Sequence, residues 1–197
     1  MIPRVSLGVL ALAVSACAAG PVEEDASRCG ANRWPGAGAP MSATGDSFAV
    51  GKPLPELQTF DQFGDPFCVS QLRGRAFVLA FTVSWGVPGG ETLPAIDAAL
   101  AGRDDAVSLT VLAQDEDGDP AAVDDAAIYA AGFEIVGPVG VDPEERYAAA
   151  YPDGIFPALY VVDEALRVRV KVATLSCDAA MTALGDVIGV TPVCASR

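Results

Sequence analysis

The 197-residue sequence contains no histidine. Histidine is the usual general base near neutral pH and the commonest metal ligand, so its absence removes both roles. Positive charge is also scarce, with 12 Lys and Arg against 26 Asp and Glu and a formal net charge of −14. This balance argues against binding nucleic acid or an anionic membrane surface through basic side chains. Any catalysis must use Cys, Asp, Glu, Lys or Tyr, and we expect neither a metal nor a cofactor.

The N-terminus lacks an apolar run long enough to be a comfortable transmembrane helix. One positive charge precedes the short run VSLGVLALAVSA, which ends at Cys17. The small residues before this cysteine resemble a bacterial lipobox, which predicts a lipoprotein signal peptide over residues 1–16 and a lipid on Cys17. Ala18 resembles the outer-membrane default of Gram-negative lipoproteins, so we expect an exported protein that is anchored facing the periplasm. An ordinary secretory peptide, with Cys17 incidental, is the alternative.

No two cysteines have the C-x-x-C spacing of redox pairs and of many zinc sites. Four cysteines follow the signal peptide, and an even number in an oxidising compartment favours structural disulfides. Cys68 lies in a predicted hairpin and Cys29 lies on a flexible segment that can reach it, so Cys29–Cys68 is the first choice. The pair Cys177–Cys194 follows by elimination. Pairing of Cys68 with Cys177 is the alternative.

Composition divides the rest of the chain into three parts. Residues 17–45 are rich in Ala, Gly, Pro and Ser and predict a flexible tether. The folded domain is expected over residues 46–189, and residues 190–197 form a C-terminal tail. Within the domain, apolar or extended runs bounded by turn signals predict a hairpin and four strands, over residues 57–60 with 66–69, and over 75–84, 106–114, 157–163 and 167–173.

Helical periodicity and capping signals predict the helices, over residues 90–102, 119–133, 142–151 and 177–190. Asp119 is the expected N-cap of the second helix, with Pro120 at its first position. The segment around it, DEDGDP, resembles a fragment of a calcium loop without the terminal Glu, and we expect a solvated, helix-capping loop. Asp142, Glu144 and Glu145 are expected as charges at the start of a short helix. Alternating strands and helices predict a sheet covered on both faces.

The chain resembles the thioredoxin-like redoxins of the TlpA and ResA type, and the neighbouring AhpC/TSA group, over about residues 47–188. The segment VGKPLPELQTFDQFGDPFCVSQLRG is similar to the family's opening, and IFPALYVVD is similar to its G-x-P-x-x-F-L-I-D strand. The resemblance implies an α/β, thioredoxin-like fold with a central mixed sheet flanked by helices and an added N-terminal β-hairpin. It also implies a cis peptide bond before Pro157, beside the family's active site.

The stretch that carries redox chemistry in this family contains no cysteine in this chain. The chain keeps Trp85 and Pro88 of the W-C-x-P-C motif, but Gly86 and Gly89 replace both cysteines. The family's chemistry needs a thiolate at a helix N-terminus and a resolving thiol one turn later, and glycine supplies neither. We expect these glycines to allow unusual backbone angles in the turn from strand to helix.

The sequence therefore predicts a redox-inactive, lipid-anchored module that binds a partner or has a structural role. Trp85, Pro88 and Phe156 are candidate lining residues of the groove in which the family docks polypeptides. The alternative is that Trp85 and Phe156 pack against each other and line no groove. A second hypothesis is a thiol–disulfide oxidoreductase, or an antioxidant redoxin, that uses a displaced pair among the four cysteines after Cys17.

Overall fold

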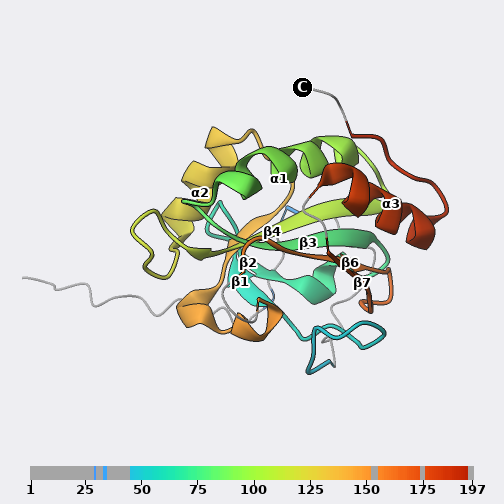
Figure 1. The fold of residues 1–197 in the computed structure, drawn as a ribbon. Helices are drawn as coiled ribbons and strands as arrows, with labels where there is room; N and C mark the ends of the chain where they lie inside the picture. The colour runs from blue at the N-terminus through green and yellow to red at the C-terminus, as the bar shows by residue number, and fades with distance from the viewer. Residues whose placement is uncertain (1–28, 30–32, 35–44, 152–154, 174–175, 195–197) are drawn as a thin grey trace, which may run out of the picture.

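The computed structural model describes residues 29, 33–34, 45–151, 155–173 and 176–194. The predicted signal peptide, Cys17 and most of the tether lie outside this part of the chain. A five-stranded sheet in the order β5-β4-β3-β6-β7 forms the centre (Figure 1). Its strands are β3 (Ala76–Val83), β4 (Ala106–Gln114), β5 (Val139–Val141), β6 (Ala158–Val162) and β7 (Val168–Val172). Strands β3, β4 and β5 are parallel to one another. Strand β6 is antiparallel to both of its neighbours, β3 and β7, so the sheet is mixed as predicted.

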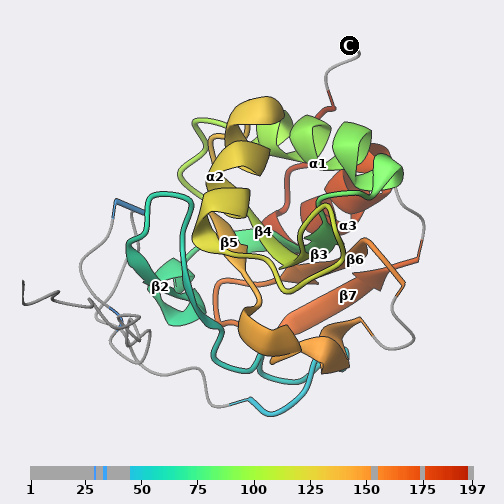
Figure 2. The ribbon, with the colours of Figure 1, turned by 90° about the vertical axis from the view of Figure 1, so that its left-hand side faces the viewer.

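Three α-helices cover one face of the sheet (Figures 1 and 2). They are α1 (Val87–Leu100), α2 (Val123–Gly132) and α3 (Cys177–Ile188). Alternate residues of β3, such as Val78 and Ala80, pack with α1 and α3, while Phe77 and Phe81 pack on the opposite face. All eight residues of β3 are buried, which explains why its sequence is a continuous apolar run.

The opposite face is covered by the predicted hairpin and by short 3₁₀ turns (Figure 2). The hairpin consists of β1 (Gln58–Phe60) and β2 (Pro66–Cys68), and the turns are η1 (Val69–Leu72), η2 (Pro143–Glu145) and η3 (Ala148–Ala150). The short helix expected over residues 142–151 is therefore two 3₁₀ turns instead. Glu144, in η2, has a left-handed φ of 55°, which prevents a continuous α-helix.

Side chains of the hairpin region pair with the main chain of the edge strand β5. The Thr59 hydroxyl donates to the Val141 carbonyl (2.6 Å) and accepts from the Val141 N–H (2.9 Å). The Gln62 amide donates to the Gly137 carbonyl (3.0 Å) and accepts from the Val139 N–H (2.8 Å). These bonds satisfy groups that an edge strand would leave open, and such open edges are templates for aggregation. The sequence pattern did not predict β5, a strand of only three residues.

Helix α2 begins at Val123, four residues after the predicted N-cap, so the prediction for Asp119 and Pro120 is wrong. The Asp115 carboxylate instead accepts the N–H groups of Asp117 and Asp119, both at 2.9 Å. The acidic segment therefore folds into a turn around its own side chain.

Both first-choice disulfides are present. Cys29 is bonded to Cys68, and Cys177 is bonded to Cys194, which excludes the Cys68–Cys177 alternative. The first joins the tether to the hairpin. The second joins the start of α3 to the segment that follows its end. None of the helices in the described ranges is long and apolar enough to cross a membrane.

The Cys177–Cys194 bond requires the tail to run back along α3. The helix ends at Ile188, and its C-cap Gly189 is left-handed with φ 76°. The tail then lies so close to the helix that a Cβ on Gly185 would be 2.8 Å from the Thr191 Cα. Glycine at position 185 is therefore required by a close backbone approach.

Gly185→Ala is expected to lower the thermal unfolding temperature, although alanine ordinarily favours a helix interior by about 0.5–1 kcal/mol. The clash with Thr191 must move main chain that is held by a disulfide, and overpacking of this kind costs about 1–3 kcal/mol. Gly132→Ala in the last turn of α2 is the control, because no atom lies within 4 Å of its Cβ position. Equal stability of the two variants would contradict the close approach.

Candidate functional site

The end of β3 and the start of β6 meet at the side of the sheet where the parallel strands end, and this side is the edge described below. Phe81 pairs with Ala158 in antiparallel register, so the residues after β3 and those before β6 leave the sheet side by side. The Phe156–Pro157 peptide bond at this edge is cis, as the sequence resemblance implied. Helix α1 starts from the same edge, two residues after Trp85. The topology therefore gathers here the positions that the sequence singled out.

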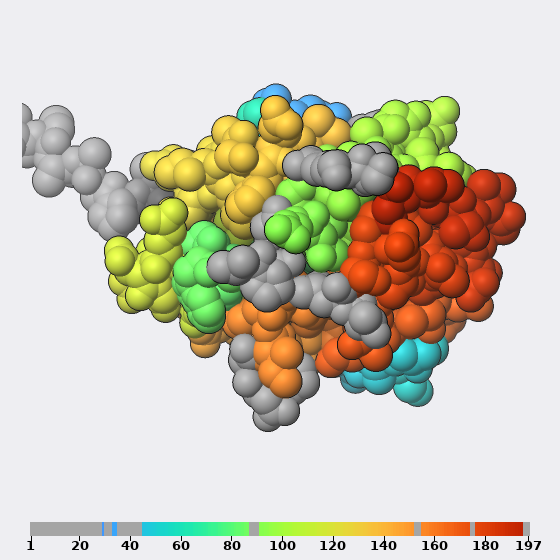
Figure 3. Space-filling view, turned by 45° about the horizontal axis from the view of Figure 1, so that its top comes forward, coloured from blue at the N-terminus to red at the C-terminus, as the bar shows by residue number. Residues whose placement is uncertain are grey.

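Large apolar side chains are exposed at this edge. Trp85 is 55% exposed and Ile155 is 68% exposed, and we call these two residues with the half-buried Phe156 the edge patch. Figure 3 shows the green surface that follows β3 between the yellow-green residues of the acidic loop, residues 115–119, and the orange residues of the segment that contains η3. The Phe156 ring contacts the Tyr151 ring (4.6 Å between centroids), and no ring contact joins it to Trp85. The edge patch is therefore an exposed apolar surface at the ends of two neighbouring strands.

Gly86 is not required by the backbone. Its φ of −82° and ψ of 101° are open to any residue, so the expected unusual backbone angles are absent at this position. A Cβ on Gly86 would lie 3.1 Å from the Val83 Cγ2, a contact that a small movement of that methyl relieves. The N-cap of α1 thus has room for a side chain but carries no sulfur. The Pro88 side chain and the surroundings of Gly89 lie outside the described part of the structure.

The four cysteines after Cys17 have different positions relative to this edge. Cys68 is fully buried on the hairpin side of the sheet, bonded to Cys29. Cys177 is the first residue of α3. Because β7 and β3 run in the same direction, α1 and α3 start from the same edge. The half-buried Cys177–Cys194 disulfide is therefore the one that the topology places on the side of the edge patch.

The buried carboxylate of Asp142 positions a tyrosine ring that packs against the edge patch. Asp142 is fully buried and accepts the Tyr147 N–H (3.0 Å) and the Tyr151 hydroxyl (2.6 Å). The Tyr151 ring in turn packs against Phe81 (5.6 Å) and Phe156. Asp142 does stand at the start of a helical turn, as predicted, because it is the N-cap of η2, with Glu144 and Glu145 in the first turn. Its carboxylate is buried, however, and does not bind the N–H groups of that turn. Burial raises the pKa of Asp142, although the Tyr151 hydroxyl acts in the opposite direction.

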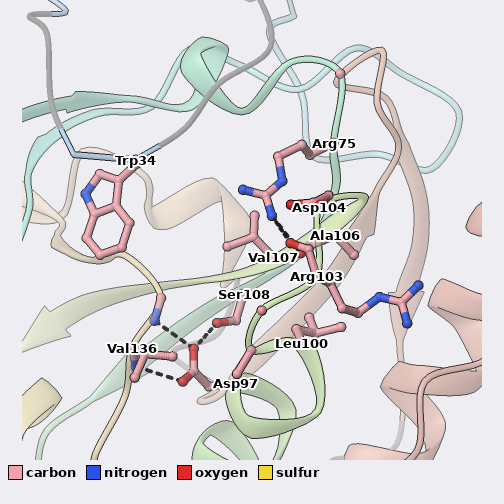
Figure 4. A pocket seen from close by; sticks show the side chains of 14 residues that line it. Trp34, Arg75, Asp97, Leu100, Arg103, Asp104, Ala106, Val107, Ser108 and Val136 are labelled. Carbon is pink, nitrogen blue, oxygen red and sulfur yellow. Dashed lines mark hydrogen bonds between the residues drawn. The ribbon is translucent and has the colours of Figure 1, made fainter.

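A separate cavity of about 460 Å³ lies at the opposite edge of the sheet, beside the end of α1 (Figure 4). Its buried Asp97 accepts from the Ser108 hydroxyl and from the N–H groups of Val136 (2.8 Å) and Gly137 (2.9 Å). Arg75 donates to two main-chain carbonyls. These groups hold α1, β4 and the 136–137 segment together, so a structural role accounts for them. No cluster of acidic or cysteine ligands that could hold a metal occurs among the residues that the structure places.

No family model matches this sequence, and no curated protein is significantly similar to it. Solved structures are similar. One is the thioredoxin domain of a thiol–disulfide oxidoreductase from Bacteroides vulgatus, with 14% identity, a TM-score of 0.58, and coverage of 71% of this chain and 98% of that one. Another is an exposed lipoprotein thioredoxin from Streptococcus pneumoniae, with 24% identity, a TM-score of 0.55, and coverage of 66% and 98%.

A third is a secreted disulfide oxidoreductase from Mycobacterium tuberculosis, with 16% identity, a TM-score of 0.53, and coverage of 66% of this chain and 95% of that one. These neighbours are thioredoxin-like thiol–disulfide oxidoreductases, and the similarity establishes a thioredoxin-like fold for this chain. The added two-stranded hairpin on the N-terminal side agrees with the prediction.

The buried Asp142 predicts a specific pH dependence of stability. A carboxyl whose pKa is raised by folding contributes its full stability below the unfolded pKa, and that stability is lost as the pH rises through the raised value. Asp142→Asn keeps an acceptor oxygen but does not titrate. Wild-type stability relative to this variant should therefore fall as the pH rises from about 3 to 7, by about 1.4 kcal/mol per unit of pKa shift. Chemical denaturation at several pH values measures it.

The control for this experiment is Asp186→Asn, which removes an exposed carboxylate on α3. Its stability relative to wild type should show no comparable slope. A difference between wild type and Asp142→Asn that stays constant over the same pH range would contradict the role given to burial.

Proposed function

We propose that this protein is a lipid-anchored, extracytoplasmic thioredoxin-like module that binds a polypeptide partner and does not catalyse thiol–disulfide exchange. One observation carries the proposal: α1 starts at the edge patch with Gly86 as its N-cap, where the redox chemistry of this fold needs a thiolate. Cys29, Cys68, Cys177 and Cys194 are all consumed in disulfides, so none of them offers a free thiol.

The edge patch supports the binding part of the proposal. Trp85 and Ile155 keep more than half of their surface exposed at the ends of two neighbouring strands. Tyr151, fixed by its bond to Asp142, supports Phe156 beside them. An apolar patch at the ends of these strands offers a partner polypeptide a preformed surface, which reduces the entropic cost of binding.

Anchoring and location rest on the sequence, because Cys17 lies outside the described residues. The lipobox-like residues before Cys17 favour a lipoprotein, and Ala18 favours the outer membrane. Two structural disulfides favour an oxidising compartment. Among proteins of similar fold, one is described as an exposed lipoprotein and one as secreted, which agrees with an extracytoplasmic site.

The position of Cys177 favours a second candidate function, a thiol–disulfide oxidoreductase that uses the Cys177–Cys194 pair. Cys177 is the first residue of a 12-residue helix, where the helix dipole stabilises a thiolate. In such an enzyme a substrate thiolate would attack one sulfur of this disulfide, form a mixed disulfide and release the other sulfur as a thiolate. Both cysteines are only half-buried, although they pack against the core between α1 and α3.

The wild-type protein is expected to reduce insulin disulfides no faster than the uncatalysed background. Gly86→Cys combined with Gly89→Cys should form a new disulfide, because the Gly86 backbone is ordinary and its Cβ site needs only a small movement of Val83. Mass spectrometry after thiol alkylation detects the bond, and insulin turbidity measures the activity gained. The matched control is Gly86→Ser with Gly89→Ser, which adds similar side chains without sulfur and should stay inactive.

One result would replace the proposed function by the second candidate. It is turnover of a disulfide substrate by wild-type protein that is lost in a Cys177→Ser, Cys194→Ser double variant and retained in the Gly86→Ser, Gly89→Ser control. Thermal unfolding of the Cys177→Ser, Cys194→Ser double variant must be measured in parallel, because loss of a disulfide also lowers stability.

A further inference from the structure

Part of the predicted tether is fastened to the hairpin. Cys29 is bonded to Cys68 of β2, and the Trp34 indole N–H donates to the buried carboxylate of Asp61 in the hairpin turn (2.6 Å). Figure 2 shows these short blue segments of the chain beside the hairpin. The chain that leads from Cys17 therefore reaches the folded domain at Cys29, well before residue 46.

The length of chain between Cys17 and Cys29 is short compared with the size of the domain. Cys29 follows Cys17 by 12 residues. A chain of this length spans at most about 40 Å when it is fully extended, and about 20 Å on average as a flexible coil. A domain of about 150 residues has a radius of gyration of about 15 Å. A lipid on Cys17 would therefore hold the side of the domain around Cys29 close to the bilayer.

Exposed apolar side chains gather where the tether is fastened. Phe63, in the hairpin turn, is 54% exposed, and Val136, in the segment before β5, is 63% exposed. Both line a groove of about 480 Å³ between the hairpin turn and α2, and most of the other residues that line it are alanines and Ile135. We call Trp34, Phe63 and Val136, together with this groove, the tip surface.

The contacts that fasten the tether leave Phe63 largely exposed. Its ring centroid lies 6.2 Å from that of Trp34 and 3.6 Å from the guanidinium carbon of Arg33. Arg33 also forms an ion pair with Asp65 (3.3 Å). With these neighbours in place, more than half of the Phe63 surface still faces solvent. The tip surface is therefore an apolar surface of the type that marks contact with another molecule.

The tip surface and the edge patch lie at opposite ends of the parallel strands. Trp34 and Val136 both line the cavity at the opposite edge, which Figure 4 shows. The edge patch instead follows the end of β3, where Phe81 pairs with Ala158. A bilayer against the tip surface therefore leaves the edge patch on the side away from the lipid, open to a partner polypeptide.

We propose that the tip surface lies against the phospholipid bilayer that holds the lipid of Cys17. This inference depends on the lipid anchor of the proposed function, and it adds which side of the domain faces the membrane. Aromatic side chains are favoured at the boundary between lipid and water. The short connection to the anchor raises the effective concentration of the tip surface at the bilayer, so a weak apolar contact is sufficient. Because Arg33 is already paired with Asp65, the contact is apolar and not ionic.

The two tryptophans of the chain provide the test, because Trp34 belongs to the tip surface and Trp85 to the edge patch. Lipidated full-length protein is reconstituted in phosphatidylcholine vesicles, with or without bromine on the acyl chains near the glycerol. Brominated lipid quenches tryptophan emission only at short range. It should quench the wild type and Trp85→Phe, which retains Trp34, and it should not quench Trp34→Phe. High salt should leave the quenching unchanged, because an apolar contact is not screened.

A matched pair of variants tests the apolar contact itself. Phe63→Ser removes the exposed ring from the tip surface and should lower the quenching of Trp34 about threefold. Val190→Ser is the control, because Val190 is 57% exposed and follows α3, across the sheet from the hairpin. This variant should be quenched as strongly as the wild type. Both side chains are exposed, so both variants should fold.

The possible results separate the membrane contact from the anchor. Lipidated protein whose Trp34 is not quenched, or is quenched equally in Phe63→Ser, overturns the contact and leaves the anchor intact. Quenching of Trp85 in place of Trp34 overturns the contact as well, because the edge patch would then face the lipid. Self-association that Phe63→Ser abolishes, without quenching, would assign the tip surface to a second copy of the chain. A mature N-terminal peptide without lipid, detected by mass spectrometry, overturns the anchor and the contact together.

Discussion

Strand β3 is buried on both faces along its whole length, and the positions of the other elements follow from this packing. One row of its side chains packs under α1 and α3, and the other packs against the hairpin and the 3₁₀ turns. Its pairing with β4 and β6 then places the start of α1 and the Phe156–Pro157 bond at one edge. A strand with so little freedom gives a rigid edge, which is what a binding site requires.

Buried side-chain hydrogen bonds join the elements that pack around the sheet. Thr59, Gln62, Asp97 and Asp142 are all buried, and each has several partners that join elements distant in the sequence. The buried Tyr129 hydroxyl interacts instead with the hydroxyl of Thr82 on β3, the strand beneath α2. Leaving a buried polar group unpaired costs more than a hydrogen bond gains, so these partners keep the elements in place.

The elements with strong apolar patterns were predictable. The runs that form β3 and β4 are continuous and bounded by turn residues, so their limits agree with the structure within one residue. Strand β5 has only three residues and gave no pattern, and α2 begins later than its capping residues indicated because Asp115 binds the loop to itself. Local side-chain bonds of this type compete with helix formation, and propensity alone does not show which arrangement is favoured.

The sequence by itself determined the order of the main strands and helices, the loss of sulfur at Gly86 and Gly89, and the excess of acidic charge, because each follows from residue type and spacing. It also made the two disulfides the first choice among three pairings. Only the tertiary structure decided that Asp142 is buried, that Gly86 has ordinary backbone angles, and that Trp34, Phe63 and Val136 meet at one surface. The physical reason is that burial and hydrogen-bond partners depend on contacts between residues far apart in the chain, which no local pattern encodes.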